Sequence, residues 1–332
     1  MQKSHVIYVV LLLFIVALFA LSLVHGSVDI PLRDVLAIFM GKETVRESWR
    51  FIVMESRLPQ ALTALLSGGA LAVSGLLLQT AFRNPLAAPD IFGVTSGASL
   101  AVALLTLAPG LMLPATLDYL SQVVAAFIGA LAVTVLIWTL GKMVHSDVLL
   151  IIIGMMIGYL ASSAITLLNF FATEEGVKSF AVWGMGNFSN VPMEQMPLFA
   201  SVIIIDTGCT FLMIKPLNAL LIGERYAENL GINVRRVRNL LLVITGLLTA
   251  VVTAFCGPIA FIALAVPHVA RLLLHTANHR RLLPVTVLCG AAIALLCNVL
   301  TTLPGESGVL PLNAVTPVIG APVILYVILK RR

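Results

Sequence analysis

Long runs of hydrophobic residues, separated by short polar segments, make up most of this chain. A helix needs about 20 mainly apolar residues to cross the ~30 Å hydrocarbon core of a bilayer. Ten stretches approach that length: Val6–Val24, Leu58–Phe82, Ile91–Ala108, Tyr119–Gly141, Val148–Phe170, Gln195–Ile214, Asn239–Cys256, Ile259–Leu274, Leu282–Leu303 and Val309–Leu329. The pattern predicts an all-α, polytopic membrane protein, with ten transmembrane helices in one transmembrane domain over residues 1–332.

Two of these stretches begin at corners rich in glycine and proline. Asn239–Ala270 has no formal charge and is too long for one helix, so we expect Gly257-Pro258 to divide it. Asn84-Pro85 to Gly93 opens the third stretch in the same manner. With five spans in each half, the second half is expected to be an inverted copy of the first. Inverted repeats place a translocation path at their interface.

Composition narrows the class of protein further. Hydrophobic residues make up 60% of the chain and charged residues 11%, less than half of the roughly 25% that is usual in soluble domains. So few charges exclude a soluble enzyme and a disordered protein. The net charge of +5 is explained by basic loops on one side of the membrane, so no nucleic-acid partner is expected.

The basic residues also predict an orientation. If the N-terminus is cytoplasmic, 14 of the 20 lie inside: Lys3, Arg83, Lys142, Lys215, Arg225, Arg235, Arg236, Arg238, Arg271, Arg280, Arg281, Lys330, Arg331 and Arg332. This bias predicts a multi-pass protein with both termini in the cytoplasm. The polar segment His25–Arg57 then lies outside, and Pro216–Arg238 lies inside.

Glycines are concentrated in the second, third and fifth predicted spans. They are Gly68, Gly69, Gly75, Gly93, Gly97, Gly154 and Gly158. Small residues one helical turn apart allow two helix backbones to approach closely, which is one interpretation. The other is that these helices line a wide path, where missing side chains leave room for a bulky solute.

Residues that could support catalysis or bind a metal are few. There is no phosphate-binding loop, no H-E-x-x-H and no G-x-S-x-G. His275 and His279 stand four residues apart in a basic loop, where charge that sets topology explains them better than a metal site. Asp206 is the one formal charge deep in a span, which indicates either a proton relay or a polar group satisfied within the bundle. We therefore expect no catalytic residues, cofactor or resident metal.

The inside loop, near residues 216–238, has a helical pattern. Ile222, Tyr226 and Leu230 recur at helical spacing between an early Glu224 and a stop at Gly231. Such a stripe indicates either a helix that covers the bundle or a helix that docks into a groove on a soluble partner.

Several motifs together resemble one transporter family. They are Arg57-Leu58-Pro59, Gly68-x-x-Leu71-Ala72-x-x-Gly75-x-x-x-Gln79, Asn84-Pro85-Leu86-Ala87-x-Pro89-x-x-x-Gly93-x-x-x-Gly97-Ala98, Gly223-Glu224-x-x-Ala227-x-x-Leu230-Gly231, Gly257-Pro258-Ile259-x-Phe261-Ile262, Pro267-His268-x-x-Arg271, His279-x-x-Leu282-Leu283-Pro284 and Gly320-Ala321-Pro322. In this order they resemble the FecCD/BtuC-type permeases of ABC importers, which take up iron–siderophores, haem and vitamin B12.

The resemblance implies a BtuC-like type II importer permease in the bacterial cytoplasmic (inner) membrane. A second permease subunit, identical or homologous, would pair with it around a central path. A cytoplasmic ABC ATPase dimer would bind the coupling loop, in which Gly223, Glu224, Arg225, Ala227, Leu230 and Gly231 match the family. An external solute-binding protein would deliver the cargo.

The resemblance also suggests docking and path residues. Arg57 fits the first arginine of a stretch near which the binding protein docks, but Gln60 replaces the second, so Arg50 is a candidate substitute. The alternative is local pairing of Arg46, Arg50 and Arg57 with the neighbouring Glu43, Glu47 and Glu55. Candidates for the path or for helix packing are Gly75, Gln79, Asn84, Pro85, Gly93, Gly97, Gly154, Gly158, Pro311 and Asn313.

The predicted function is thus the import of a metal chelate, with iron–siderophore favoured and haem or vitamin B12 as alternatives. The segment Val309–Asn313 departs from the common E-L-P-x-G, so the cargo does not follow from the resemblance. An ion-coupled secondary transporter is the competing class. It would normally contain several ionisable residues within the membrane, and this chain has one. A membrane enzyme has no supporting motif.

Overall fold

The computed structural model describes residues 2–26, 28–41, 46–108, 115–144, 146–305 and 308–330, and these residues contain helices and no strands. Glu43, Arg331 and Arg332, which entered the charge analysis, lie outside the described residues, as does the side chain of Lys3. The fold class predicted from the hydrophobic pattern is confirmed.

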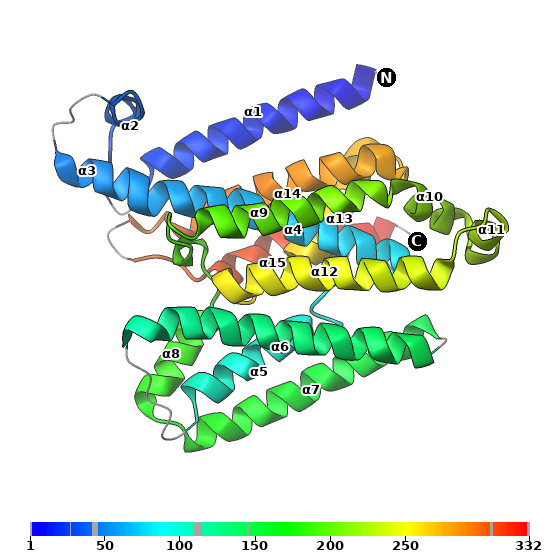
Figure 1. The fold of residues 1–332 in the computed structure, drawn as a ribbon. Coiled ribbons are helices and arrows are strands. Elements are labelled where there is room, and N and C mark those ends of the chain that lie inside the picture. Colours follow the sequence, from blue (N-terminus) through cyan, green and yellow to red (C-terminus); the bar gives the residue numbers. More distant parts are fainter. Residues whose placement is uncertain are drawn as a thin grey trace.

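The helices follow one another with short connections (Figure 1). The first half contains α1 (Gln2–Val24), α2 (Leu32–Phe39), α3 (Glu47–Phe51), the π-helix η1 (Ile52–Arg57), α4 (Leu58–Ala81), α5 (Val94–Thr106), α6 (Ala115–Met143) and α7 (Asp147–Phe171). The remainder contains α8 (Glu174–Gly184), the 3₁₀ turn η2 (Phe188–Asn190), α9 (Met196–Leu212), α10 (Ile214–Ile222), α11 (Glu224–Asn229), α12 (Val234–Cys256), α13 (Ile262–Leu274), α14 (His279–Thr301) and α15 (Leu312–Lys330).

Each predicted span contains an apolar helix, but the helices differ in length. Within the described residues six are long enough to cross a membrane, α9 and α10 form a pair bent by 51°, and α5, α13 and the apolar part of α15 are shorter. The predicted starts at Ile91 and Ile259 were wrong, because the corners extend to Gly93 and Phe261. The 13-residue helices that follow are about 20 Å long.

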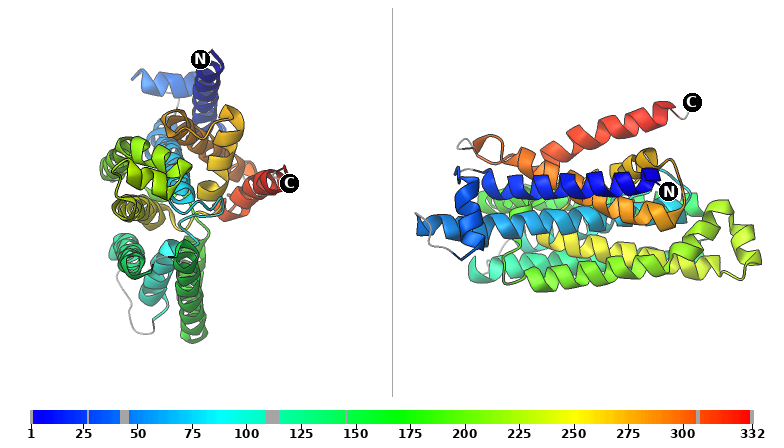
Figure 2. Two further views of the ribbon diagram at one scale, coloured as in Figure 1. Left: turned by 90° about the vertical axis from the view of Figure 1, so that its right-hand side faces the viewer. Right: turned by 90° about the horizontal axis from the view of Figure 1, so that it is seen from above.

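The long helices run roughly side by side, which gives the molecule two distinct ends (Figures 1 and 2). α10 and α11 project from one end, and both termini lie at that same end. α2, α3 and α8 lie at the opposite end. We call these the α11 end and the α8 end. Termini at one end agree with an even number of crossings.

Helices α4 and α14 form the centre of the core. In the most apolar window of α4, 83% of the residues are buried, against 17% in α7. Close packing of α4 on α14 depends on two facing glycines. A Cβ atom on Gly68 would lie 2.2 Å from the carbonyl oxygen of Gly290, and one on Gly290 equally close to that of Gly68. The backbones therefore touch at the middle of the bundle.

The two halves of the chain repeat one arrangement in opposite directions. In each, a long helix, a corner and a 13-residue helix follow one another: α4 into α5, and α12 into α13. α4 ends beside α14's first residue, His279, at the α11 end, since Thr80 contacts that histidine. α12 begins at the α11 end and finishes at the α8 end, where the carbonyl of Cys256 accepts from the N–H of Asn187. This is the geometry of an inverted repeat.

Candidate functional site

Helices α10 and α11 project beyond the bundle at the α11 end of the molecule (Figure 2). Four of their apolar side chains, Leu221, Ile222, Tyr226 and Leu230, are between 45% and 66% exposed. We call these four side chains the α10–α11 surface. Because they are exposed, the stripe predicted from the sequence does not serve as a cover for the core. An exposed apolar group of this kind is typical of a site that binds another protein.

The predicted coupling residues shape this surface in different ways. Gly223, with φ of 144°, breaks the helix between α10 and α11, so the sequence holds two short helices where one was predicted. Ala227 is fully buried, and its carbonyl accepts from the N–H of Ile232. Gly231 has φ of 78°, a conformation that favours glycine. Ala227 therefore anchors α11, while Leu230 is presented to solvent.

Charged residues fix α11 to the start of α12. Arg238 donates to Glu224, with 2.7 Å between Nη2 and Oε1. Asn233 caps α12 by accepting from the N–H of Arg236. Arg225 is exposed on the outer side of α11. The position of the α10–α11 surface relative to the bundle is thus held by one ion pair and one buried alanine.

Buried polar side chains connect α10 to the central helices. The Oδ1 of Asn218 on α10 accepts from the backbone N–H of His279 at 2.8 Å and lies 3.0 Å from Nδ1 of the same residue. The Nε2 of His279 lies 2.9 Å from the hydroxyl of Thr80 on α4. His279 is 1% exposed. Its interpretation as a topology-setting loop residue was therefore wrong, because it lies inside the bundle as a bridge between three helices.

The residue before Thr80 extends this contact to α13. Gln79 accepts from Arg271 at 2.6 Å and donates to the carbonyl of Leu264 at 3.2 Å. Gln79 was a candidate for the path or for helix packing, and the structure places it between α4 and α13. We call Asn218, His279, Thr80, Gln79 and Arg271 the α11-end network. Nothing in the spacing of these residues along the chain indicates that they meet.

The candidate glycines of the path lie at helix contacts. A Cβ atom on Gly75 would lie 1.7 Å from the carbonyl oxygen of Ala263, and one on Gly154 would lie 2.7 Å from that of Ile91. Gly97 is similarly close to Gly129. Gly158 has more space, with Ser96 Oγ at 3.4 Å from its Cβ position. Of the two interpretations, close packing describes Gly75, Gly97 and Gly154, and Gly158 remains open to either.

The two corners hold the other candidates. In the corner of residues 82–93, Asn84 accepts from the N–H of Leu86, and the carbonyl of Pro85 lies 2.9 Å from Nε2 of His268. Gly93, with φ of 75°, begins α5. Pro311 directly precedes α15.

Asn313 binds the corner of residues 257–261. It donates to the carbonyls of Pro258 at 2.7 Å and Gly184 at 3.1 Å, and accepts from the N–H of Ala260 at 3.1 Å. Asn313 is therefore the residue that joins α15, this corner and the end of α8.

The two candidate docking arginines lie in different environments. Arg50 is exposed on α3. Arg57 is 5% exposed, and its guanidinium donates to the carbonyls of Leu23, Val24 and Val28. Neither forms an ion pair with a carboxylate in the described part of the chain, so the predicted local pairing is not seen for them. Gln60 donates to Asn298 on α14. Arg57 is a buried cap of α1, whereas Arg50 is free to meet a partner.

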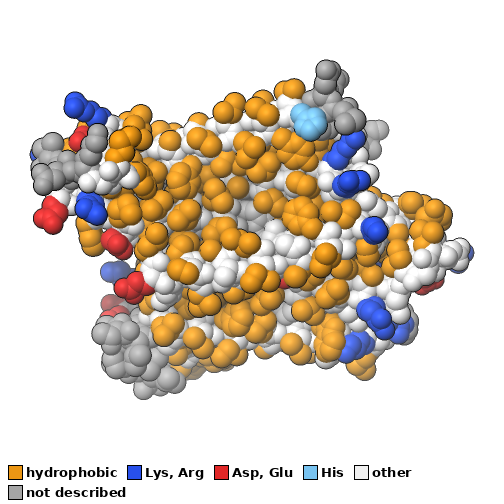
Figure 3. All heavy atoms as spheres, turned by 45° about the horizontal axis from the view of Figure 1, so that its top comes forward, with side chains coloured by type: hydrophobic (Ala, Val, Ile, Leu, Met, Phe, Trp, Pro, Cys, Tyr) orange, Lys and Arg blue, Asp and Glu red, His pale blue; other side chains and the backbone are white. Residues whose placement is uncertain are grey.

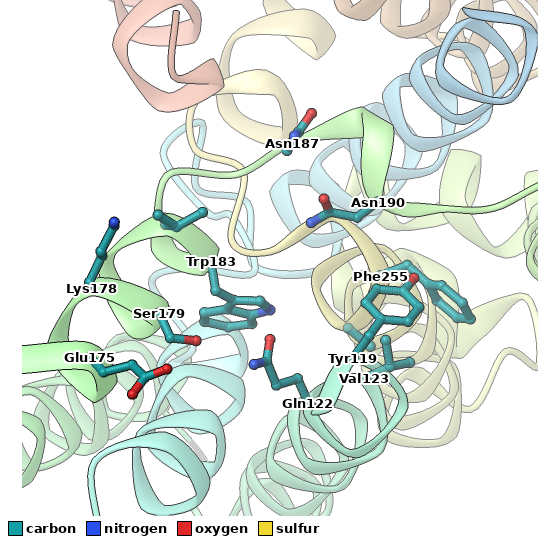
Figure 4. Close-up of a pocket in the computed structure, with 12 residues that line it drawn as sticks. Tyr119, Gln122, Val123, Glu175, Lys178, Ser179, Trp183, Asn187, Asn190 and Phe255 are labelled. Carbon is teal, nitrogen blue, oxygen red and sulfur yellow. The ribbon is translucent and has the colours of Figure 1, made fainter. Parts of the chain in front are cut away.

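A pocket with apolar, aromatic and polar lining residues opens at the α8 end between α6, α8 and α12 (Figure 4). Its volume is about 520 Å³. Trp183 on α8 faces Gln122 on α6, and Tyr119 and Phe255 form another part of the wall. The indole N–H of Trp183 and the hydroxyl of Tyr119 have no hydrogen-bond partner among the described residues. Both atoms are buried, so the groups that the pocket presents to a ligand are aromatic faces and polar side chains such as those of Ser179 and Asn187.

The remaining ionisable candidates do not assemble into a site. Asp206 is buried in α9, and its Oδ2 has no hydrogen-bond partner in the described residues. The same residues contain no group of three or more His, Cys, Asp or Glu side chains that could hold a metal ion. All four cysteines are free.

Comparison with known proteins shows similarity over nearly the whole chain. The sequence model of the FecCD transport family matches residues 12–330. The hemin transport system permease protein HmuU of Yersinia pestis is 32% identical over 326 residues, covering 98% of this chain and 95% of that protein. The vitamin B12 import system permease protein BtuC of Citrobacter koseri is 35% identical over 313 residues, covering 92% and 93%.

Solved structures show the same similarity in three dimensions. An inward-facing structure described as a metal-chelate type ABC transporter superposes with a TM-score of 0.85 at 28% identity, covering 98% of this chain and 99% of that chain. PsaBC from Streptococcus pneumoniae, in complex with a Fab, matches with a TM-score of 0.50 at 18% identity, over 81% and 90%. The second match concerns the fold alone.

Proposed function

Because the chain belongs to the FecCD transport family, and is thus a permease of an ABC importer, we propose that it carries a metal chelate across the bacterial inner membrane by alternating access. The relatives are named for haem and vitamin B12 and the structural neighbour for a metal chelate. Within this class we propose an iron–siderophore as the cargo, with haem and vitamin B12 as the alternatives. ATP hydrolysis belongs to partner chains.

The α10–α11 surface is the observation that carries the mechanism. A cytoplasmic ATPase dimer would bind Leu221, Ile222, Tyr226 and Leu230, since exposed apolar side chains at the tip of short helices fit a groove on a soluble protein. Both termini lie at the same end, which in this proposal is the cytoplasmic side. The basic residues of this end support that orientation.

The α11-end network connects the proposed ATPase-binding surface to the helices of the bundle. Movement of α10 would displace Asn218, and through His279 and Thr80 it would act on α4. Gln79 and Arg271 would pass the displacement to α13. Coupling between distant sites is carried by packed side chains and hydrogen-bond networks that have two discrete arrangements, and this network is proposed to switch the path between its two openings in that way.

Two further partners would bind elsewhere. A second permease subunit would pack against the face that α7 and α15 leave exposed, where only 17% of the α7 window is buried within one chain. An external solute-binding protein would dock at the α8 end, with Arg50 as a steering cation. The pocket at Trp183 lies at this end, where the chelate would arrive.

The experiment is transport by the reconstituted complex with its ATPase and binding protein. Iron–siderophore, haem and cobalamin are offered separately, and uptake into vesicles is measured with and without ATP. Uptake of one chelate that requires ATP supports the proposal. Failure of all three, with normal ATP hydrolysis, contradicts the assigned cargo class.

The docking role is tested with Leu230→Asp, which places a charge at the centre of the apolar surface. Transport should fall at least tenfold and uncouple from ATP hydrolysis, because burying an unpaired charge in an interface is costly. Asn229→Asp is the matched control, since it adds the same charge to the neighbouring exposed residue without removing an apolar contact. Normal transport by Leu230→Asp at normal insertion levels contradicts ATPase docking at this surface.

Two further measurements test the orientation and the second partner. With Cys209 replaced by alanine, a cysteine at Asn229 should react with impermeant reagents only from the cytoplasmic side. Arg50→Glu should weaken association of the binding protein, most visibly at low salt. If Arg50→Glu has the same affinity for the binding protein as the wild type at every salt concentration, the role of Arg50 is contradicted.

A further inference from the structure

An apolar groove runs along the outer face of the bundle between α1 and α9. Its volume is about 470 Å³, and its lining is almost entirely hydrophobic. Leu12 and Ile15 of α1 form one wall, and Ile204 and Phe211 of α9 form the other. The floor consists of α4 and α14, with the small residues Gly69 and Ala291. The groove faces the region that a membrane would occupy.

Two arginines lie in line with this groove at its α11 end. Arg280 and Arg281 stand in the first turn of α14, seven residues before Val287 and Leu288, which line the groove. Residues seven apart lie on the same face of a helix, about 10 Å apart along its axis. Figure 3 shows the hydrophobic side chains that cover this face and the Lys and Arg side chains gathered along its α11 end.

Both guanidinium groups lack an acidic partner. They are exposed, and neither takes part in an ion pair within the described residues. The chain contains no Asp or Glu from position 1 to 28 or from position 229 to 305, so α1 and α14 have no acidic residue. Glu224 of α11 is paired with Arg238, and within the described residues neither arginine forms an ion pair with Glu228 of α11 or with Asp206 of α9. The positive charge at this end of the groove is not neutralised by the elements that form it.

The position of Tyr8 indicates how deep in the membrane the two arginines lie. The hydroxyl of Tyr8 on α1 donates to the carbonyl of Arg281. Tyrosines of transmembrane helices concentrate at the membrane interface, where their hydroxyl group reaches the headgroups. The headgroup layer is roughly 5–8 Å deep on each side. Arg280 and Arg281 thus lie at headgroup level, and the groove begins at the depth of the acyl chains.

We propose that this groove binds one anionic glycerophospholipid, with its phosphate on Arg280 and Arg281 and one acyl chain between α1 and α9. The lipid would join α1, which is sparsely buried, to α9, which leads directly into α10. Basic pockets beside transmembrane helices recognise anionic headgroups, and the groove adds the hydrophobic contact that selects this position on the surface. A zwitterionic lipid would satisfy the groove but leave the arginines without a net counter-charge.

The test compares dioleoyl phosphatidylglycerol with dioleoyl phosphatidylcholine, which share their acyl chains. The purified full-length protein is delipidated in detergent and titrated with each lipid, and binding is followed by native mass spectrometry and by the rise in melting temperature. Phosphatidylglycerol should bind more tightly to the unaltered protein. Arg280→Gln with Arg281→Gln should weaken its binding roughly 30-fold, because each cation near an anionic headgroup strengthens binding by about fivefold.

A second variant tests the groove independently of charge. Gly208 of α9 lines the groove, and a Cβ atom there would meet nothing within 4 Å. Gly208→Leu should therefore fill the groove without disturbing the fold, and it should weaken phosphatidylglycerol binding while both arginines remain. Cys209→Leu is the matched control, since it adds an exposed leucine on the next residue.

The charge variant also has a matched control. Arg235→Gln with Arg236→Gln removes an exposed basic pair at the same end, away from the groove, and should leave binding unchanged. Three results would each overturn the proposal: equal affinity for the two lipids, equal weakening by both arginine pairs, or unchanged binding in Gly208→Leu.

Discussion

The corner of residues 82–93 and the corner of residues 257–261 occupy corresponding places in the two halves of the chain, at opposite ends of the molecule. The first uses twelve residues and contacts His268 of α13 through the carbonyl of Pro85. The second uses five residues, and Asn313 binds it with both ends of its side-chain amide. Each corner contains two residues with positive φ, Arg83 and Gly93 in the first and Gly257 and Phe261 in the second. Each corner thus connects a long helix to a 13-residue helix. The first corner is long and is bound to another helix through Pro85, whereas the second is short and is bound by several hydrogen bonds of Asn313.

The difference indicates which corner has room to change. A five-residue turn held by three hydrogen bonds of one side-chain amide has one arrangement, because any shift leaves carbonyl groups unpaired. The longer corner has its own local hydrogen bonds, such as the N–H of Leu86 to Asn84, and loses little when the contact between Pro85 and His268 is released. We therefore expect the α8-end corner to act as a fixed pivot and the α11-end corner to move with the α11-end network.

The largest expected effect comes from Gly257→Ala. Its backbone, with φ of 74° and ψ of 178°, lies in a region that essentially only glycine occupies, and a Cβ atom would lie 2.4 Å from the carbonyl oxygen of Trp183. Strain and overpacking should together lower the free energy of unfolding by about 3–5 kcal/mol. Gly93→Ala, with φ of 75° and its nearest contact at 3.0 Å, should lose about 1–2 kcal/mol. Thermal unfolding in detergent measures both. An equal loss of stability in the two variants would contradict the claim that the second corner is the more rigid one.

Asn313→Leu should have the next largest effect. It removes the partners of the Pro258 and Gly184 carbonyls and of the Ala260 N–H, which should cost about 2–4 kcal/mol. Asn84→Leu removes a single local bond in the other corner and should cost less than about 1 kcal/mol. The two variants are compared by the same unfolding assay. A larger loss for Asn84→Leu would mean that the longer corner is the more rigid one.

His268→Phe tests the tie of the first corner to α13. The ring nitrogen that meets the carbonyl of Pro85 is lost, while the aromatic volume is kept, so we expect a loss of about 1–2 kcal/mol. His5→Phe, at an exposed position of α1, should change stability by less than about 0.5 kcal/mol. Stability unchanged by His268→Phe would show that the first corner holds its shape without α13.

A pH dependence is expected in the first corner, which contains Asp90. Burial raises the pKa of Asp90 from 3.8 to about 6, while a hydrogen bond with the Thr95 side chain acts in the opposite direction. The folded protein then binds a proton more readily than the unfolded chain, so the protonated carboxyl favours folding below about pH 4, and this stabilisation is lost as pH rises from about 4 to 6. Unfolding of wild type and Asp90→Asn is compared from pH 3.5 to 7. Parallel profiles would contradict the shifted pKa.

The contrast between local and distant information explains what the sequence could predict. Ten hydrophobic stretches and the corners at Asn84-Pro85 and Gly257-Pro258 are local signals, and the structure has helices and turns at those places. The lengths of α5 and α13 were overestimated because residues such as Ile91 and Ile259 are apolar whether they lie in a helix or in a buried corner.

The contacts that join the helices could not be predicted in this way. Asn218 and His279 are 61 residues apart, and Asn313 and Gly184 are 129 apart. These contacts depend on how whole helices pack against one another, and a short sequence pattern does not contain that information. Arg57 illustrates the same point, since its charge suggested a surface role and its position inside the bundle follows only from the packing of α1 on the turn before α4.

The cap that Arg57 provides for α1 also implies an order of events during biosynthesis. The last carbonyls of a helix have no partner within that helix, and here those of Leu23 and Val24 are satisfied by a side chain that follows them by 34 and 33 residues. A ribosome therefore releases the first hydrophobic segment into the membrane well before it translates the arginine that completes it. The last carbonyl groups of α1 therefore obtain their hydrogen-bond donor only when the segment that contains Arg57 has entered the membrane and packed against α1.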